Sequence, residues 1–214
     1  MQAATQQLRQ MAEQAPWREV LQRALKKNSN CRHSRYVQLA TVRPDGRPAN
    51  RTVVYRGFLG DGLGESLGET DVLTFVTDCR SNKVGEIAHN PWAEVAWYFP
   101  DTREQFRLLG KLSVVNAATA DEKLQKGRRA AWKTMSDPGR QQFMWPQPGE
   151  PRGGDDSIFK PEPPSADSPV LDAFCLVCLA VEEVDHIQLA KNLRHRYLRG
   201  GGGGGEWASQ NVNP

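Results

Sequence analysis

The chain has 214 residues, of which 38% are hydrophobic, and its formal net charge is only +3. A chain of this length and composition can bury a sizeable core, which excludes a disordered protein and suits a single domain over residues 1–214. The small charge excess does not predict nucleic acid as a partner, although it is compatible with a small phosphorylated ligand.

The sequence also indicates in which cellular compartment we expect the protein. Its N-terminus is polar, and no stretch reaches the roughly 18 consecutive apolar residues of a membrane-spanning helix. Its four cysteines are few and scattered, which does not suggest a disulfide framework. We therefore expect a cytoplasmic protein with no membrane contact.

The first elements in chain order are helical and then β. Residues 1–30 are expected to form an N-terminal helical segment, because residues 6–27 place apolar side chains at helical spacing, interrupted near Pro16. A β-rich pattern predicts a hairpin over residues 36–58, with its turn at the Pro-Asp-Gly sequence of residues 44–46.

The middle of the chain alternates strands with short helices. Residues 60–69 are glycine-rich and are expected to form a surface loop, followed by a strand over 72–77. Ser81 is expected to be the N-cap of a helix over 82–89. Two more strands are predicted, over residues 92–99 and 104–115.

The second half begins with two predicted helices. A capping box from Thr119 to Glu122 is expected to open a helix that reaches about Lys133. Asp137 is expected to be the N-cap of a short helix with Pro138 as its first residue. A long irregular loop is then predicted over the proline-rich residues 146–169, followed by strands over 173–187, 193–199 and 206–212.

Several short strands with helices at intervals predict a mainly β protein, a β-barrel with flanking helices. A doubly wound sheet would need regular alternation of strands and helices, which this order lacks.

The best physical case for a ligand site lies between residues 75 and 83. A strand is expected to end at Thr77 and a helix to begin after Ser81, so free backbone N–H groups and the helix dipole favour an anion there. Lys83 adds a positive charge, and Arg51 on a neighbouring predicted strand could add a bidentate contact. A plain N-cap beside a solvated lysine explains the same residues, so these residues alone leave both interpretations open.

The order and spacing of residues 51–111 resemble the FMN-binding core of the pyridoxamine 5'-phosphate oxidase-like family, which folds as a split β-barrel. The matching pieces are Arg51-Thr52-Val53-Val54-Tyr55-Arg56, Val76-Thr77, Ser81-Asn82-Lys83, Asn90-Pro91, Glu104-Gln105 and Gly110-Lys111. A weaker match covers residues 195–198, and the Phe-x-Trp-Pro-x-Pro-Gly sequence of residues 143–149 resembles a less characterised branch.

The resemblance implies FMN as the cofactor, bound at the interface of a homodimer. It implies cofactor contacts from Arg51, Thr52, Val53, Val54, Val76, Thr77, Ser81, Asn82, Lys83, Gln105 and Arg196. In this assignment Arg51, Thr77, Ser81 and Lys83 hold the phosphate, with a weaker contact from Asn82. Residues 52–54 line the isoalloxazine ring, Gln105 reaches it from the second subunit, and Arg196 lies near its polar edge.

Substrate residues depart from the oxidase pattern. Arg56 stands where the oxidase has a lysine for the substrate phosphate, and it keeps the positive charge. The oxidase's Arg-x-His substrate motif is absent, because Asn192 and Arg194 occupy its positions, and Ile187 replaces a flavin-contacting tryptophan. Flavin binding is therefore expected, while oxidation of pyridoxamine phosphate is not.

The leading hypothesis is an FMN-dependent oxidoreductase with a small-molecule substrate and no evident general base. A flavin-binding or sensing module with little turnover is the alternative, as is a split barrel that binds haem or a deazaflavin. The basic run 123–133 fits a solvated helix face better than a nucleic-acid site. No metal site is predicted, and Cys175 and Cys178 are expected to be packed core residues.

Overall fold

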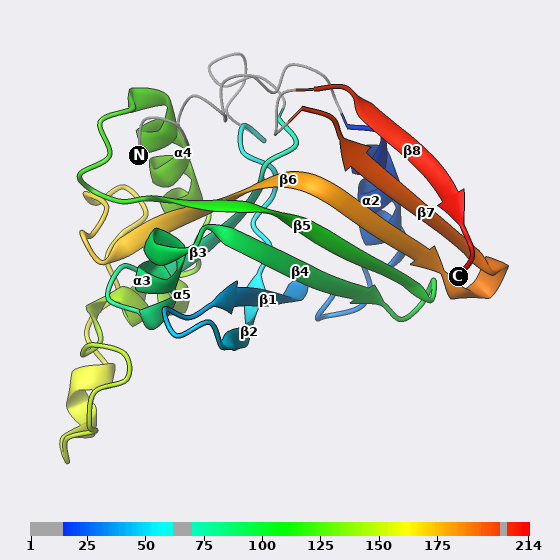
Figure 1. The fold of residues 1–214 in the computed structure, drawn as a ribbon. Helices are drawn as coiled ribbons and strands as arrows, with labels where there is room; N and C mark the ends of the chain where they lie inside the picture. Colours follow the sequence, from blue (N-terminus) through cyan, green and yellow to red (C-terminus); the bar gives the residue numbers. More distant parts are fainter. Residues whose placement is uncertain (1–14, 62–69, 202–204) are drawn as a thin grey trace.

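The computed structural model describes residues 15–61, 70–201 and 205–214 (Figure 1). Its strands are β1 (Tyr36–Val42), β2 (Pro48–Val54), β3 (Leu73–Asp78), β4 (Trp92–Phe99), β5 (Glu104–Val115), β6 (Phe174–Gln188), β7 (Leu193–Arg199) and β8 (Trp207–Val212). Its α-helices are α2 (Pro16–Lys27), α3 (Asn82–His89), α4 (Glu122–Lys133) and α5 (Asp137–Gln141). Short 3-10 helices cover Gln142–Met144, Asp156–Phe159 and Leu189–Lys191.

All the described strands belong to one antiparallel sheet that closes on itself. The strand order is β2-β1-β4-β5-β6-β7-β8, and β3 pairs with β6 off this path. Beyond the end of β2, the N–H of Arg56 donates to the Thr74 carbonyl at 2.9 Å, and the N–H of Thr74 donates to the Gly57 carbonyl at 2.9 Å. These bonds join the chain after β2 to β3 and complete a barrel, which confirms the predicted mainly β fold.

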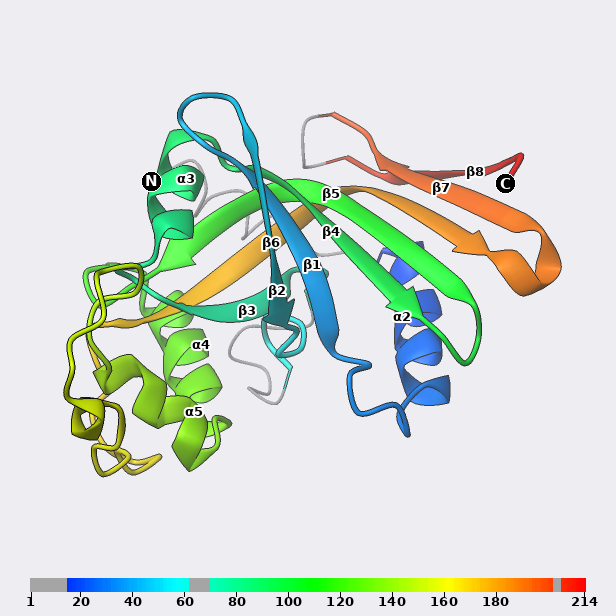
Figure 2. The ribbon, with the colours of Figure 1, turned by 90° about the horizontal axis from the view of Figure 1, so that it is seen from below.

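Strand β6 is long enough to pair with three other strands. Its first half pairs with β3 and β5, and its second half pairs with β5 and β7. The strands β7 and β8 therefore extend the sheet beyond the barrel (Figure 2). Helices α3, α4 and α5 lie toward one end of the strands and α2 toward the other (Figures 1 and 2).

Alternating apolar side chains of β4 and β5 fill the barrel. Trp97, Phe99, Phe106 and Leu108 are fully buried, as period-two alternation requires for strands with one face on a core. Helix α2 adds Trp17 to the same cluster, and Pro16 at its start suits a first-turn position. The structure thus confirms a helix in residues 16–27, while residues 1–14 lie outside the described residues.

Most predicted elements have the expected ranges. The helix over 82–89 and the strands over 92–99, 104–115 and 193–199 have the predicted bounds. The 146–169 segment is irregular apart from the 3-10 helix Asp156–Phe159, as expected. Most of the predicted 60–69 loop lies outside the described residues.

Both predicted helix caps in the second half were wrong by one or two residues. The N-cap of α4 is Asp121, whose Oδ1 accepts from the N–H groups of Lys123 and Leu124 at 2.9 and 3.2 Å. Thr119 instead accepts from the N–H of Asn116 in the preceding turn. The N-cap of α5 is Ser136, so Asp137 is already helical. In each case another residue with a strong capping preference lies beside the predicted one.

The helix α4 is less solvated than its basic sequence predicted. Arg128 is buried, and its guanidinium donates to the carbonyls of Phe174 and Leu171 at 2.9 and 2.7 Å. Trp132 is also fully buried. Cys175 and Cys178 are both buried, which confirms them as core residues. No described helix is both long and apolar enough to cross a membrane.

We predict that Gly110→Ala destabilises the barrel by roughly 3 kcal/mol. Gly110 lies at an irregularity in the β5–β6 pairing, and a Cβ there would meet the Ala180 carbonyl oxygen at 2.1 Å. Gly85→Ala is the control, because a Cβ in this helical position meets nothing within 4 Å and alanine favours a helix. Urea unfolding measures both, and equal midpoints for the two variants would contradict the role of Gly110.

Candidate functional site

The junction between β3 and α3 leaves two backbone N–H groups without a hydrogen-bond acceptor among the described residues. Ser81 is the N-cap residue of α3, as predicted, but its hydroxyl makes no cap hydrogen bond and donates to the Asp78 carbonyl at 2.7 Å. Among the described residues, none accepts a hydrogen bond from the backbone N–H of Asn82 or Lys83. Such free N–H groups at a helix start, together with the helix dipole, attract an anion.

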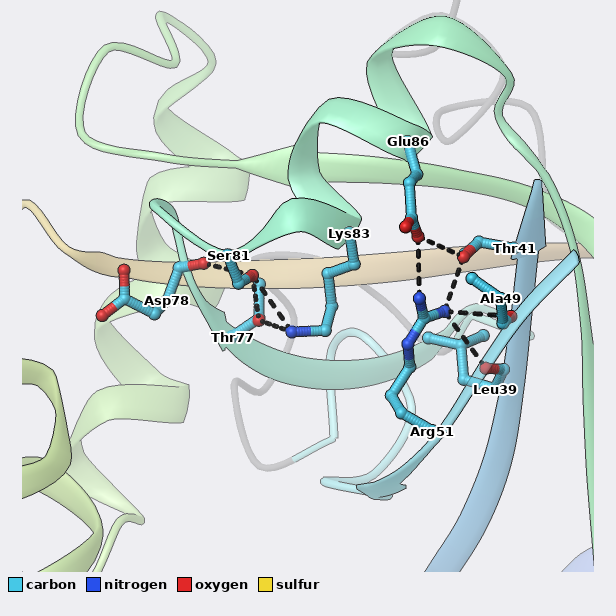
Figure 3. A network of polar contacts seen from close by, with 9 residues as sticks. All are labelled: Leu39, Thr41, Ala49, Arg51, Thr77, Asp78, Ser81, Lys83 and Glu86. Atoms are coloured by element: carbon cyan, nitrogen blue, oxygen red, sulfur yellow. Dashed lines mark hydrogen bonds and ion pairs between the residues drawn. The ribbon is translucent and has the colours of Figure 1, made fainter. Parts of the chain in front are cut away.

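Lys83 folds back over this junction (Figure 3). Its Nζ donates to Thr77 Oγ1 at 2.8 Å and to Ser81 Oγ at 3.0 Å, and the two hydroxyl oxygens lie 3.1 Å apart. Burial and the positive charge of Arg51 lower the pKa of Lys83, so the ammonium is held where an anion would stabilise it. The structure therefore brings Thr77, Ser81 and Lys83 together as one donor cluster.

A second cluster surrounds Arg51 beside the first (Figure 3). The Arg51 guanidinium donates through Nη2 to Glu86 Oε2 at 2.7 Å and through Nη1 to Thr41 Oγ1 at 2.5 Å. The Thr41 hydroxyl in turn donates to Glu86 Oε2 at 2.5 Å. Arg51 comes from β2, Thr41 from β1 and Glu86 from α3, so three elements meet in this network.

The two cations of the site differ in how their charges are balanced. Burial opposes ionisation of Glu86, but hydrogen bonds from Thr41 and Arg51 outweigh it, and the pKa of this carboxyl is lowered. Glu86 is therefore ionised at neutral pH and compensates Arg51. Within the described part of the chain, Lys83 forms no ion pair with a carboxylate, so its charge is the one available to a ligand.

Arg80 ties the junction to the irregular segment. Its Nε and Nη2 donate to the two carboxylate oxygens of Asp78 at 2.9 and 2.6 Å. The same Nη2 donates to the Trp145 carbonyl at 2.9 Å, and the Trp145 indole N–H donates to the Phe159 carbonyl at 3.0 Å. Arg80 thus neutralises the acid in the turn and anchors the start of the 146–169 segment.

The residues predicted to line the flavin ring lie on strands β2 and β3. Thr52 is exposed on β2, and Val53 and Val54 beside it are half-buried. Val76 on β3 is also half-buried and packs against the cluster around Trp132. Asn82 is exposed at the first position of α3.

Gln105 and Arg196 are not joined to the β3–α3 junction. Gln105 lies on β5 opposite Tyr98 and Ile187, and Arg196 lies on β7, where it donates to Glu183 at 2.5 Å. Within the described chain, no hydrogen bond or ion pair links either residue to Arg51 or Lys83. The roles predicted for these two residues therefore stay predictions.

Arg56 lines a separate pocket. It lies beyond the end of β2, and burial lowers the pKa of its guanidinium, with a contribution from the nearby positive charge of Arg35. Its Nε is buried without a hydrogen-bond partner. The remaining pocket walls are Phe58, Leu59, Gly60, Asp61, Thr74, Gly127, Ala130, Ala131, Thr134 and Leu176. The short side chains of α4 in this list leave the space in front of Arg56 open.

Sequence reasoning missed Thr41, Glu86 and the Arg80–Trp145 contact. Glu86 follows Lys83 by one helical turn, and this spacing could have placed both on one face of α3. The pairing of Arg51 with Leu39, two residues before Thr41, depends on a β-hairpin register that no local pattern fixes.

A closed antiparallel barrel with a lysine–hydroxyl cluster at its first strand–helix junction defines the class of protein. Residues 14–116 match the family described as "Pyridoxamine 5'-phosphate oxidase, FMN-binding domain". Pyridoxine/pyridoxamine 5'-phosphate oxidase 2 of Arabidopsis thaliana is 39% identical over 202 residues, which are 94% of this chain and 98% of the relative. The chain therefore belongs to the pyridoxamine 5'-phosphate oxidase-like family.

Solved structures agree with this assignment. A pyridoxamine 5'-phosphate oxidase-related, FMN binding protein from Nostoc punctiforme is 44% identical, with a TM-score of 0.85 over 94% of this chain and 100% of its own. PhzG from Burkholderia lata, solved with tetrahydrophenazine-1-carboxylic acid, has a TM-score of 0.68 over 95% of this chain and 99% of its own. Because its identity is only 18%, that likeness extends to the fold alone. The predicted split-barrel fold is confirmed.

We predict that Arg80→Gln releases the 146–169 segment and makes it more sensitive to limited proteolysis. The substitution removes the charge-assisted bonds to Asp78 and the bond to the Trp145 carbonyl. Arg47→Gln is the matched control, because Arg47 bonds Asp45 two residues before it in the same way but lies on an exposed turn. Unchanged cleavage in Arg80→Gln would show that this segment is held by its other contacts.

Proposed function

We propose that this chain binds FMN and uses it to oxidise or reduce an anionic small molecule. The observation that carries the proposal is the donor cluster at the β3–α3 junction, where Lys83 contacts two hydroxyl groups and, in the described chain, forms no ion pair with a carboxylate. Membership of a family described by its FMN-binding domain makes a flavin phosphate the best candidate for that site.

The donor set fits a phosphate group. A phosphate has several strong acceptor oxygens, and the junction offers the Lys83 ammonium, the Thr77 and Ser81 hydroxyls and two free backbone N–H groups. Arg51 stands beside this cluster and adds a further donor group, because none of the described residues accepts from its Nε. Asn82 at the helix start would add an amide contact.

The flavin ring would lie along β2. Residues 52–54 and Val76 would line it, and when bound the flavin would supply hydride chemistry while the chain binds and orients it. Gln105 and Arg196 lie away from the junction in a single chain, so we propose that the second copy in a homodimer contributes Gln105. In this proposal the cofactor lies at the dimer interface.

The pocket of Arg56 indicates the substrate class. A half-buried guanidinium whose Nε lacks a partner would favour an anionic group such as a phosphate or carboxylate. Arg194, which replaces the oxidase histidine, donates through Nε and Nη2 to Asp185 at 2.9 and 2.7 Å. Asp185 also accepts from Arg107 at 2.8 Å. Because Arg194 stands in place of the oxidase histidine and is held by Asp185, we do not propose pyridoxamine phosphate itself as the substrate.

The donor cluster at the β3–α3 junction also supports a second candidate, a flavin-binding module with little turnover. Bleaching of the flavin absorbance on addition of a substrate would distinguish the enzyme from the module. Haem or deazaflavin bands in the visible spectrum would instead keep the barrel and change the chemistry. We also propose a cytoplasmic location, which the four free cysteines support, because free thiols are usual in reducing compartments.

We predict that Lys83→Gln weakens FMN roughly 10- to 100-fold and leaves riboflavin, which lacks the phosphate, unchanged. The expected loss follows from one charge-assisted contact of about 1.5–3 kcal/mol. Isothermal titration with both flavins gives the dissociation constants, and visible absorbance after gel filtration reports whether FMN is retained.

Lys123→Gln is the matched control for this test. Lys123 occupies the second position of α4, as Lys83 does in α3, but it is exposed. Equal FMN affinities for the Lys83 and Lys123 variants, both folded, would remove Lys83 from the phosphate site. Failure of the unmodified protein to bind FMN at all would remove the proposed cofactor.

A further inference from the structure

We infer that Glu86 is a specificity-determining residue of the phosphate site, which lowers the attraction of the site for a dianion and orients Arg51. The inference rests on the proposed function, because it concerns the group that would hold the flavin phosphate. Glu86 itself has no counterpart among the residues that the family resemblance implied for the cofactor.

The geometry places Glu86 at the edge of the site rather than on a solvated face. It follows Lys83 by three positions on α3, so both side chains lie on one side of the helix (Figure 3). Glu86 is 7% exposed and its Oε2 accepts from Arg51 and from Thr41 at 2.7 and 2.5 Å. A carboxylate in this position is held by two neighbours and cannot swing away into water without breaking both bonds.

The charges around the junction add up to a weak excess. Asp78 and Arg80 form one ion pair, and Glu86 and Arg51 form another, so Lys83 is the cation of the cluster in Figure 3 that has no ion pair among the described residues. The positive charge of Arg43 also contributes, as the smallest of the causes, to the lowered pKa of Glu86. A phosphomonoester carries a charge of about −1.5 to −2 at neutral pH, so the site as built does not fully neutralise it.

Without the negative charge of Glu86, the two positive charges of Arg51 and Lys83 would together balance the charge of a dianion. Burial makes the effect larger than at the surface, because charges interact more strongly where water is excluded. Glutamine in place of glutamate keeps an acceptor oxygen for Arg51 and Thr41, so Glu86→Gln separates the charge from the hydrogen bonds. Glu86 therefore keeps the binding of a phosphorylated ligand moderate and reversible.

The test measures FMN, riboflavin and inorganic phosphate on matched variants. Glu86→Gln should bind FMN about tenfold more tightly and gain a larger rise in melting temperature from inorganic phosphate, with riboflavin affinity unchanged. Arg51→Gln should weaken FMN about tenfold or more, because it leaves the Glu86 carboxylate unopposed. The double variant Arg51→Gln with Glu86→Gln should return to within about threefold of the unmodified protein, because the charge sum is restored.

Other results overturn the inference. Unchanged or weaker FMN binding in a folded Glu86→Gln variant would mean that Glu86 acts only as a clamp for Arg51. A double variant that binds FMN no more tightly than Arg51→Gln alone would mean the same. If Glu86→Gln does not fold on its own, the comparison of the folded double variant with Arg51→Gln decides between the two results. If the unmodified protein binds no FMN, the proposed function fails, and the inorganic phosphate series still tests Glu86 independently.

Discussion

The closure of the barrel is the constraint on which the site depends. Two backbone hydrogen bonds between the chain after β2 and the start of β3 bring together strands that are distant in the sheet order. As a result Arg51, on β2, stands beside the β3–α3 junction, and the proposed phosphate site has one arginine and one lysine from different elements. The same closure involves Arg56, whose N–H makes one of the two bonds and whose side chain lines a pocket together with residues of α4.

The pairing of charges at the β3–α3 junction determines which group can attract a ligand. Each acid at the junction is paired with an arginine, Asp78 with Arg80 and Glu86 with Arg51, so the ammonium of Lys83 carries the net attraction. Arg80 also donates to the Trp145 carbonyl, which links the Phe-x-Trp-Pro-x-Pro-Gly sequence to the turn between β3 and α3. That sequence therefore has a structural explanation in this protein, as the anchor of the 146–169 segment.

Local patterns predicted the fold well because each strand and helix shows its own periodicity. The strand over 104–115 and the helix over 82–89 were predicted with their observed bounds. The N-caps of α4 and α5 were not, since several capping residues stand side by side and only the folded helix selects one. The cluster of Thr77, Ser81 and Lys83 was predictable because its members lie within seven consecutive residues.

Long-range contacts set the limit of sequence reasoning. The contact of Arg51 with Thr41 follows from the β1–β2 register, and that with Glu86 from the placement of α3 on the barrel end. Neither is visible in a local pattern. The flavin roles of Gln105, predicted to act from a second subunit, and of Arg196, predicted near the polar edge of the ring, stay predictions for the same reason.

The central claim is that the β3–α3 junction holds the phosphate of FMN, and a crystal structure of the complex tests it most directly. The account predicts phosphate oxygens within hydrogen-bond distance of Lys83 Nζ and of the Thr77 and Ser81 hydroxyls. A flavin phosphate bound elsewhere, with the Lys83–Thr77–Ser81 contacts intact, would contradict it.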